Sequence, residues 1–341
     1  MNRRITRTAR AAALVLGAGL VLAGPALAQT PVGAVSLDPE ETITINGMEV
    51  LHVRGNVYLI AGGSAHVVMQ VGDQGVLLVD TGDSGESERI LAAVRAVTHR
   101  PVRYIVNSSG EPAHVLGNGP IVETYGGARG PRPQQVGGRV GNQNSGVIVI
   151  SHEGAYNRMS ATGAGSAGLS GDALPASTFF TAKKDIYSND EAVQIIHVPS
   201  AYTEGDVLVF FRGSDVIAAG EIFNTTGYPL IDREHGGSIN GVIDGLNMLI
   251  DLAVPERNQM GGTRIVPSHG RIGNESDVVE YRDMLTIIRD RVQEMKAKGM
   301  SLQQVQASGV SLEYDVLYGS TTGPWTTAMF LEAVYAGVGG Q

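Results

Sequence analysis

The sequence predicts an α/β protein that folds as a four-layer αββα sandwich. Alternating apolar residues predict three short strands in the first half, at residues 57–60, 66–71 and 76–79. The second half repeats the plan with strands at residues 192–198, 206–211 and 215–218. Each set of strands is followed by a helix. Two such halves can stack their sheets face to face with the helices outside, so strand ends from both halves would meet at one edge.

The predicted helices carry the apolar stripe that this packing needs. The helix at residues 86–98 places four apolar side chains on one face, with Ser84 expected as its N-cap. A long helix at residues 275–298 is expected to start at an N-cap, Asn274. Its apolar stripe consists of Val278, Tyr281, Leu285, Ile288, Val292 and Met295. A terminal helix is expected at residues 325–335.

The first residues have the pattern of a cleaved secretory signal. A leader with four arginines precedes an apolar segment at residues 11–23 and a small-x-small site at residues 26–28. The segment is shorter than the ~20 apolar residues of a membrane span. We therefore expect cleavage after Ala28, no stable membrane anchor afterwards, and a periplasmic or secreted protein. Residues 29–49 are expected to be extended, and residues 50–341 to form the domain, with flexible insertions at about 119–145 and 161–173.

The amino-acid composition excludes some kinds of metal ligand and some classes of partner. The chain has 341 residues, of which 43% are hydrophobic, enough for a sizeable core. It contains no cysteine, which excludes disulfides and thiolate metal ligands. Its net charge is −9, whereas nucleic-acid-binding proteins carry an excess of positive charge. Nucleic acid is therefore excluded as a partner. The expected partner is therefore a small molecule.

One polar loop follows a buried strand in the way that reactive loops do. The predicted strand at residues 102–106 runs into a loop with Glu111 and His114. Ser108 and Ser109 lie in the same loop, five to six residues before the histidine. Serine catalysis is one interpretation, although no Gly-x-Ser-x-Gly elbow surrounds either serine.

Four motifs in order then resemble the metallo-β-lactamase superfamily. GVLLVDTG at 75–82 resembles its Gly-Val-x-Leu-Ile-Asp-Thr-Gly strand, and AYTEGD at 201–206 resembles Ala-His-Thr-x-Gly-Asp. GEIF at 220–223 resembles part of Gly-Asp-x-x-Phe, and IVPSHG at 265–270 resembles Ile-x-Pro-Gly-His-Gly. The resemblance covers roughly residue 50 to the end. It implies the αββα fold and a site for metal ions at one edge.

The metal ligands of that family are only partly kept. The family's loop reads His-x-His-x-Asp-His after Asn-Thr, and the matching positions here hold Ser109, Glu111, Ala113 and His114. Tyr202 stands where the family has a further histidine, and Glu221 replaces the bridging aspartate. The late histidine is kept as His269. The resemblance thus implies that all three ligands of the first metal are lost, whereas three of the four second-site positions keep a competent residue.

The residues that remain allow one metal ion. His114, Glu221 and His269 would be its ligands, with zinc expected before iron or manganese. Metal-bound water could then hydrolyse an ester, lactone, thioester or amide-like bond. Glu111 would be an auxiliary ligand or a base, and Asp80 would orient a ligand. Tyr202 could donate to an oxyanion.

Three further interpretations stay open at this point. The lost ligands agree equally well with a catalytically inactive, metal-free binding protein of the same fold. An intact two-metal site is disfavoured, because such a hydrolase needs both ions to share the nucleophile. His66 follows a Gly-Gly turn and is a candidate replacement ligand, although a hydrogen-bonded histidine is the more common case.

Overall fold

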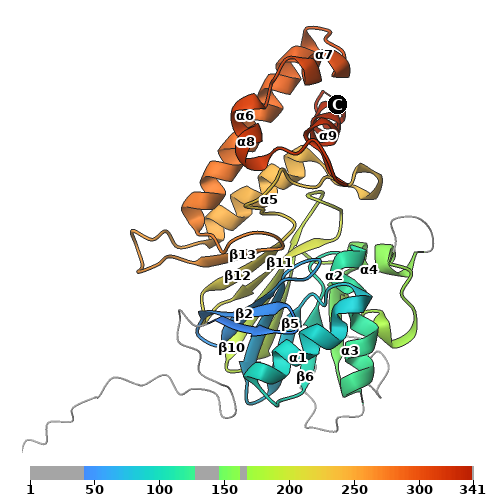
Figure 1. Cartoon of the computed structure of the whole chain (residues 1–341), viewed down its shortest axis with the longest axis vertical. Helices are drawn as coiled ribbons and strands as arrows, with labels where there is room; N and C mark the ends of the chain where they lie inside the picture. Colours follow the sequence, from blue (N-terminus) through green and yellow to red (C-terminus); the bar gives the residue numbers. More distant parts are fainter. Residues whose placement is uncertain (1–41, 127–145, 162–166, 340–341) are drawn as a thin grey trace, which may run out of the picture.

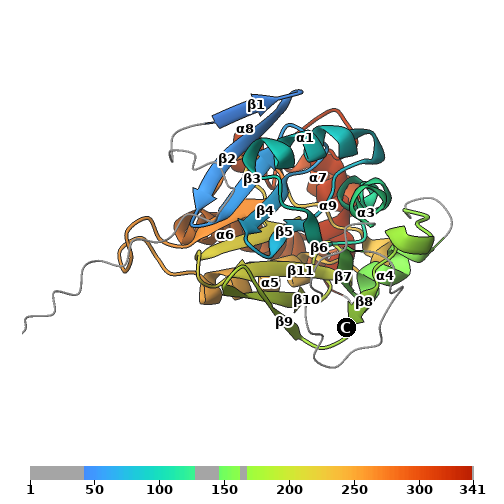
Figure 2. The same ribbon diagram turned by 90° about the horizontal axis from the view of Figure 1, so that it is seen from below.

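The computed structural model describes residues 42–126, 146–161 and 167–339, and in these residues two β-sheets pack face to face between layers of helices (Figures 1 and 2). This arrangement confirms the predicted αββα sandwich. The predicted signal sequence at 1–28 lies outside the described residues. No helix of the described part is both long and apolar enough to cross a membrane.

The first sheet contains eight strands in sequence order. They are β1 (Thr42–Ile45), β2 (Met48–Arg54), β3 (Val57–Ala61), β4 (Val67–Gly72), β5 (Gly75–Val79), β6 (Val102–Val106), β7 (Ile148–His152) and β8 (Ser177–Phe179). The first five strands pair antiparallel, whereas β5 to β8 pair in parallel. The carboxyl ends of β5, β6 and β7 therefore lie at the same edge of the sheet.

The second sheet has the order β13-β12-β11-β10-β9. Its strands are β9 (Lys183–Ser188), β10 (Glu191–Val198), β11 (Asp206–Phe211), β12 (Val216–Gly220) and β13 (Arg264–Pro267). Only β12 and β13 are parallel, so their carboxyl ends also open at one edge. The backbone amide of Val207 donates to the carbonyl of Ser108, which joins the start of β11 to the loop after β6.

Helices cover the outer face of each sheet. The first half contributes α1 (Ser87–Val97), α2 (Pro112–Val115), α3 (Asn118–Tyr125) and α4 (Glu153–Ser160). The second half contributes α5 (Ile239–Leu252), α6 (Glu275–Ala297), α7 (Leu302–Ala307), α8 (Leu312–Tyr318) and α9 (Thr327–Gly337). Short 3-10 helices are η1 (Ser84–Glu86), η2 (Gly171–Ala173) and η3 (Arg233–His235). In Figure 1, α5 lies above β12 and β13 of the second sheet, and α1 and α3 lie on the opposite side of the two sheets.

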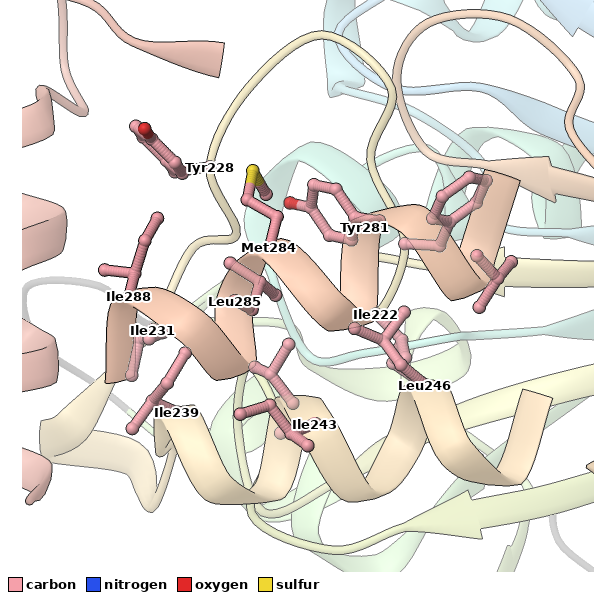
Figure 3. Packing of buried hydrophobic residues seen from close by; sticks show 14 of the residues in the cluster. Ile222, Tyr228, Ile231, Ile239, Ile243, Leu246, Tyr281, Met284, Leu285 and Ile288 are labelled. Carbon is pink, nitrogen blue, oxygen red and sulfur yellow. The ribbon is translucent and has the colours of Figure 1, made fainter. Parts of the chain in front are cut away.

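Apolar side chains form the core in layers that match this architecture. One cluster lies between the sheets, one beneath α1 and α3, and the largest beneath α5, α6 and α9. Figure 3 shows Tyr281, Leu285 and Ile288 of α6 facing Ile243 and Leu246 of α5. The stripe predicted for the long helix is therefore its buried face.

The predicted cap of α6 is confirmed, and the predicted cap of α1 is wrong. The Asn274 side chain accepts from the backbone amide of Asp277, whose carboxylate accepts from the amide of Asn274, as in a capping box. Before α1, however, the chain forms η1, which is capped by Asp83, so Ser84 lies inside that turn.

Two segments expected to be loops contain helical turns. The predicted insertion at 119–145 starts with α3, whose Ile121 and Val122 are buried under α1, while residues 127–145 lie outside the described part. In the predicted flexible segment at 161–173, η2 forms and Leu169 packs against Met159. The strands β1, β8 and β9 and the helices α7 and α8 were not predicted. The first sheet also starts at residue 42, before residue 50 where the alternation is clear.

Candidate active site

The site is built where strands of both sheets end. Asp80 follows β5, the loop from residue 107 follows β6, Glu221 follows β12, and His269 comes two residues after β13. The parallel pairing of β5 with β6 and of β12 with β13 points these four ends to one edge. All residues that the sequence predicted for the metal site lie in this region.

His114 is held between two carboxylates. It lies on α2 with no exposed surface, and its Nδ1 is 2.8 Å from Oδ2 of Asp80. Its Nε2 is 2.9 Å from Oε1 of Glu221. Burial by itself would lower the pKa of His114, but Asp80 and Glu221 raise it well above the usual value. Both ring nitrogens can therefore carry a proton and donate.

The backbone at Asp80 is fixed in an uncommon conformation. Its φ is +65°, which is rare outside glycine, and its amide donates to the carbonyl of Val106. Its carboxylate accepts from the amide of Ser108 at 2.7 Å and from the Ser108 hydroxyl at 2.5 Å. Asp80 thus contacts His114 in the way that an orienting role requires.

The geometry does not favour serine catalysis. Ser108 and Ser109 are each 1% exposed, so a substrate in solvent cannot reach either hydroxyl. The Ser108 hydroxyl also donates to Asp80, and the Ser109 hydroxyl accepts from the amide of Glu111. The Ser108 hydroxyl also lies 3.4 Å from Nδ1 of His114, but that nitrogen is closer to Asp80, at 2.8 Å.

Glu221 joins His114 to a more exposed histidine. Nε2 of His269 is 3.3 Å from the same Oε1, and 39% of the His269 side chain is exposed. Burial would raise the pKa of Glu221, but its bonds to His114 and His269 lower it well below the usual value. His66 lies nearby, where its Nδ1 contacts the carbonyl oxygen of Pro267 at 2.9 Å. Burial lowers the pKa of His66, which favours its neutral form.

Glu111 and Tyr202 form a second group. The Tyr202 hydroxyl donates to Oε2 of Glu111 at 2.5 Å, and Arg158 donates to the same oxygen. Burial, and after it the charge of Glu111, raises the pKa of Tyr202, so the hydroxyl stays protonated. Glu111 is thus paired with Arg158 and Tyr202. Its predicted roles as auxiliary ligand or base, and the oxyanion role of Tyr202, remain predictions.

Sequence reasoning missed Arg158 and Asp232. Nη2 of Arg158 lies 3.0 Å from Oδ2 of Asp232, which also contacts Nδ1 of His235 at 2.7 Å. A signal for Arg158 existed in principle, because Glu111 stands where the family has a neutral histidine, and a partly buried carboxylate favours a cation beside it. The sequence did not show which cation, since α4 lies more than 40 residues further along the chain.

The described residues contain no preformed group of metal ligands. In residues 42–126, 146–161 and 167–339, no group of three or more His, Cys, Asp or Glu side chains is arranged to hold one. His114, Glu221 and His269 lie together, but Nε2 of each histidine lies beside Oε1 of Glu221, at 2.9 and 3.3 Å, as in hydrogen bonds. Ala113 adds no ligand where the family has an aspartate.

The overall structure resembles solved proteins of one fold. No protein-family profile and no curated protein sequence matches this chain. The stereoselective inverting sec-alkylsulfatase Pisa1 from Pseudomonas sp. superposes with a TM-score of 0.58 and 13% identity, over 84% of this chain and 49% of that one. This chain thus spans about half the length of that sulfatase.

Two metallo-β-lactamases are matched over nearly their whole length. The enzyme from Pontibacter korlensis has a TM-score of 0.50 and 15% identity, over 72% of this chain and 98% of that one. The DIM-1 metallo-β-lactamase has a TM-score of 0.52 and 11% identity, over 72% and 99%. The chain therefore has the metallo-β-lactamase fold, as its motifs indicated, and identities this low establish the fold alone.

Proposed function

We propose that this protein binds a small molecule at the shared edge of its two sheets and does so without a catalytic metal ion. The observation that carries the proposal is the position of His114, whose two ring nitrogens are both bound by carboxylates. A metal ligand must offer a free lone pair, and a proton on Nε2, which lies 2.9 Å from Glu221, would occupy the nitrogen that an ion needs. The contact of Nδ1 with Asp80 would be the same in a metal-bound histidine. The protein would then be a non-catalytic member of its fold class.

Polar side chains at the edge support ligand binding there. His269, Glu111 and His235 are partly exposed, whereas Glu221 and Arg158, which contact the first two, are buried. A rigid buried layer beneath partly exposed polar groups is a suitable base for a binding site.

Elemental analysis of the purified chain tests the proposal. We expect less than roughly one tenth of an equivalent of zinc, iron or manganese per chain at neutral pH, where an unperturbed histidine is mostly neutral. His114→Ala and His269→Ala should leave that content unchanged, as should His99→Ala at an exposed position. About one ion per chain, lost in His114→Ala and His269→Ala but not in His99→Ala, would contradict the proposal.

A second candidate is a hydrolase with one divalent ion. It is favoured by a single observation: Nε2 of His114 and Nε2 of His269 both lie beside Oε1 of Glu221, at 2.9 and 3.3 Å. An ion would have to displace the protons between these atoms, and it would supply a Lewis acid at this edge. Zinc is the first choice, followed by iron or manganese.

A substrate screen separates the two candidates. Ester, lactone, thioester and amide substrates would be tested with the chain as purified and after incubation with zinc, iron or manganese. Turnover that needs an added ion and is lost in His269→Ala supports the hydrolase. Absence of turnover, together with binding of small molecules detected by thermal shift, supports the metal-free binding protein.

We further propose that the chain is exported and works in the periplasm or outside the cell. The support is the arginine-rich leader with its short apolar segment and the site after Ala28. Amino-terminal sequencing of the protein recovered from a bacterial periplasmic fraction would test this. A mature chain that starts elsewhere than residue 29 would contradict the cleavage site.

A further inference from the structure

Protein side chains contact one another at the position that the resemblance assigns to the first metal ion. The resemblance places the three ligands of that metal at residues 109, 111 and 202. Two of these residues, Glu111 and Tyr202, contact each other directly across 91 positions of sequence. They converge as ligands of one ion would, although one is a carboxylate and the other a phenol.

The charged group between them is the guanidinium of Arg158. Its Nη2 lies 2.5 Å from Oε2 of Glu111 and 3.5 Å from the hydroxyl of Tyr202. The same nitrogen lies 3.0 Å from Oδ2 of Asp232, and the guanidinium carbon lies 5.4 Å from the centre of the Tyr202 ring. Only 6% of the Arg158 side chain is exposed. The cation is thus enclosed by two carboxylates and a phenol.

Close backbone packing fixes the position of α4, which carries Arg158. A side chain at Gly110 would meet the carbonyl oxygen of Ala155 at 2.7 Å and Cβ of Arg158 at 2.9 Å. A side chain at Gly205 would meet the amide nitrogen of Ala155 at 2.1 Å. Glycines therefore let the Glu111 loop and the Tyr202 turn both approach α4, and the arginine extends from the point where they meet.

We propose that Arg158 is a built-in cation that takes the place of the first metal ion. It neutralises the carboxylates of Glu111 and Asp232, as a divalent ion would, and it joins the same loop segments across the two halves. A guanidinium suits this task because it stays charged when buried and offers several donors in one plane. The inference concerns the first position alone, so it holds whether or not an ion binds at His114, Glu221 and His269.

Chemical rescue tests the inference in the full-length mature chain. Arg158→Ala should lower the Tm, because it leaves Glu111 and Asp232 without their cation. Millimolar guanidinium, far below denaturing concentrations, should raise the Tm of this variant by about 2–4 °C and leave the wild type unchanged. Arg291→Ala, which removes an exposed ion pair with Glu313, is the matched control and should show no rescue. Failure of guanidinium to stabilise Arg158→Ala selectively would overturn the proposal.

Restoring the imidazoles provides a second, independent test. Ser109→His, Glu111→His and Tyr202→His would be combined once with Arg158 retained and once with Arg158→Ala. We expect roughly one zinc per chain only when Arg158 is removed, measured by elemental analysis in a background that carries His114→Ala. Equal zinc content in both variants, or none in a folded variant without Arg158, would overturn the proposal. If these variants do not fold, the rescue experiment still decides.

Discussion

The two metal positions of this fold are filled in different ways in one chain. At the second position, the family's residue types largely persist, and His114 binds Asp80 on one side and Glu221 on the other. At the first position, no family ligand persists, and Arg158 joins Glu111, Tyr202 and Asp232. One position keeps two of the family's histidines and an acid, and these side chains contact one another. The other has changed its side chains and kept a positive charge.

This difference indicates that the acidic side chains at this edge of the sheets need positive charge beside them. Four acidic side chains gather there: Asp80, Glu111, Glu221 and Asp232. Buried carboxylates that lack a partner are costly, so cations must accompany them whether or not catalysis takes place. In this chain a histidine and an arginine do so. Loss of the metal ligands therefore does not imply loss of a well-ordered edge.

The largest effect is expected at the second position, where His114, Asp80 and Glu221 are all buried. His114→Ala leaves Asp80 and Glu221 facing each other without a donor between them, and should lower the free energy of unfolding by about 3–5 kcal/mol. Urea unfolding at pH 7 measures this change. His99→Ala, at an exposed position, should change the value by less than about 0.5 kcal/mol. If His114→Ala lowered the free energy of unfolding by less than about 1 kcal/mol, His114 would not be the cation that stabilises the second position.

A pH-dependent change in the free energy of unfolding, of intermediate size, is expected from His152, which caps the helix that carries Arg158. His152 is the N-cap of α4, where its Nδ1 accepts from the amide of Gly154. Its ring stacks on His197 at 3.6 Å, and Nε2 of His197 contacts the carbonyl oxygen of Glu204. Burial, and after it the charge of His197, lowers the pKa of His152 from 6.5 to about 4.

The sign follows from that lowered pKa. The folded state holds His152 neutral, so the stability that it contributes is complete above pH 6.5 and is lost as the pH falls towards about 4. His152→Asn keeps a cap acceptor but cannot take up a proton. Between pH 8 and pH 5 the wild type should lose about 2 kcal/mol more than this variant in urea unfolding. If the free energy of unfolding changed with pH in the same way in both proteins, His152 would not be the group responsible.

The smallest effect is expected from the hydroxyl of Tyr202. Tyr202→Phe removes the bond to Glu111 but leaves that carboxylate bound by Arg158, so the cost should be about 1 kcal/mol. Thermal unfolding measures it, with Tyr187→Phe at an exposed strand position as the control. A cost equal to that of Arg158→Ala would show that the tyrosine, and not the cation, holds the first position together.

Much of the fold was readable from the chain itself. Apolar alternation located β3, β4 and β5, and the stripe of α6 with its Asn274 cap gave that helix its limits and its buried face. These features are local, because periodicity and capping depend on residues within a few positions of one another. Strands such as β1 and β9 were not predicted, since their exposed faces carry polar residues and only pairing with a neighbour selects them.

The residues of the candidate site could be predicted from the sequence, but the contacts between them could not. The sequence alone located Asp80, His114, Glu221 and His269 at strand ends, and the order of their motifs indicated the fold. Only the tertiary structure decided that both nitrogens of His114 face carboxylates and that Arg158 stands beside Glu111 and Tyr202. The physical reason is that these charge pairs form between side chains that sheet packing brings together. The paired residues are 34 to 107 positions apart, and no local sequence pattern identifies a partner at such a separation.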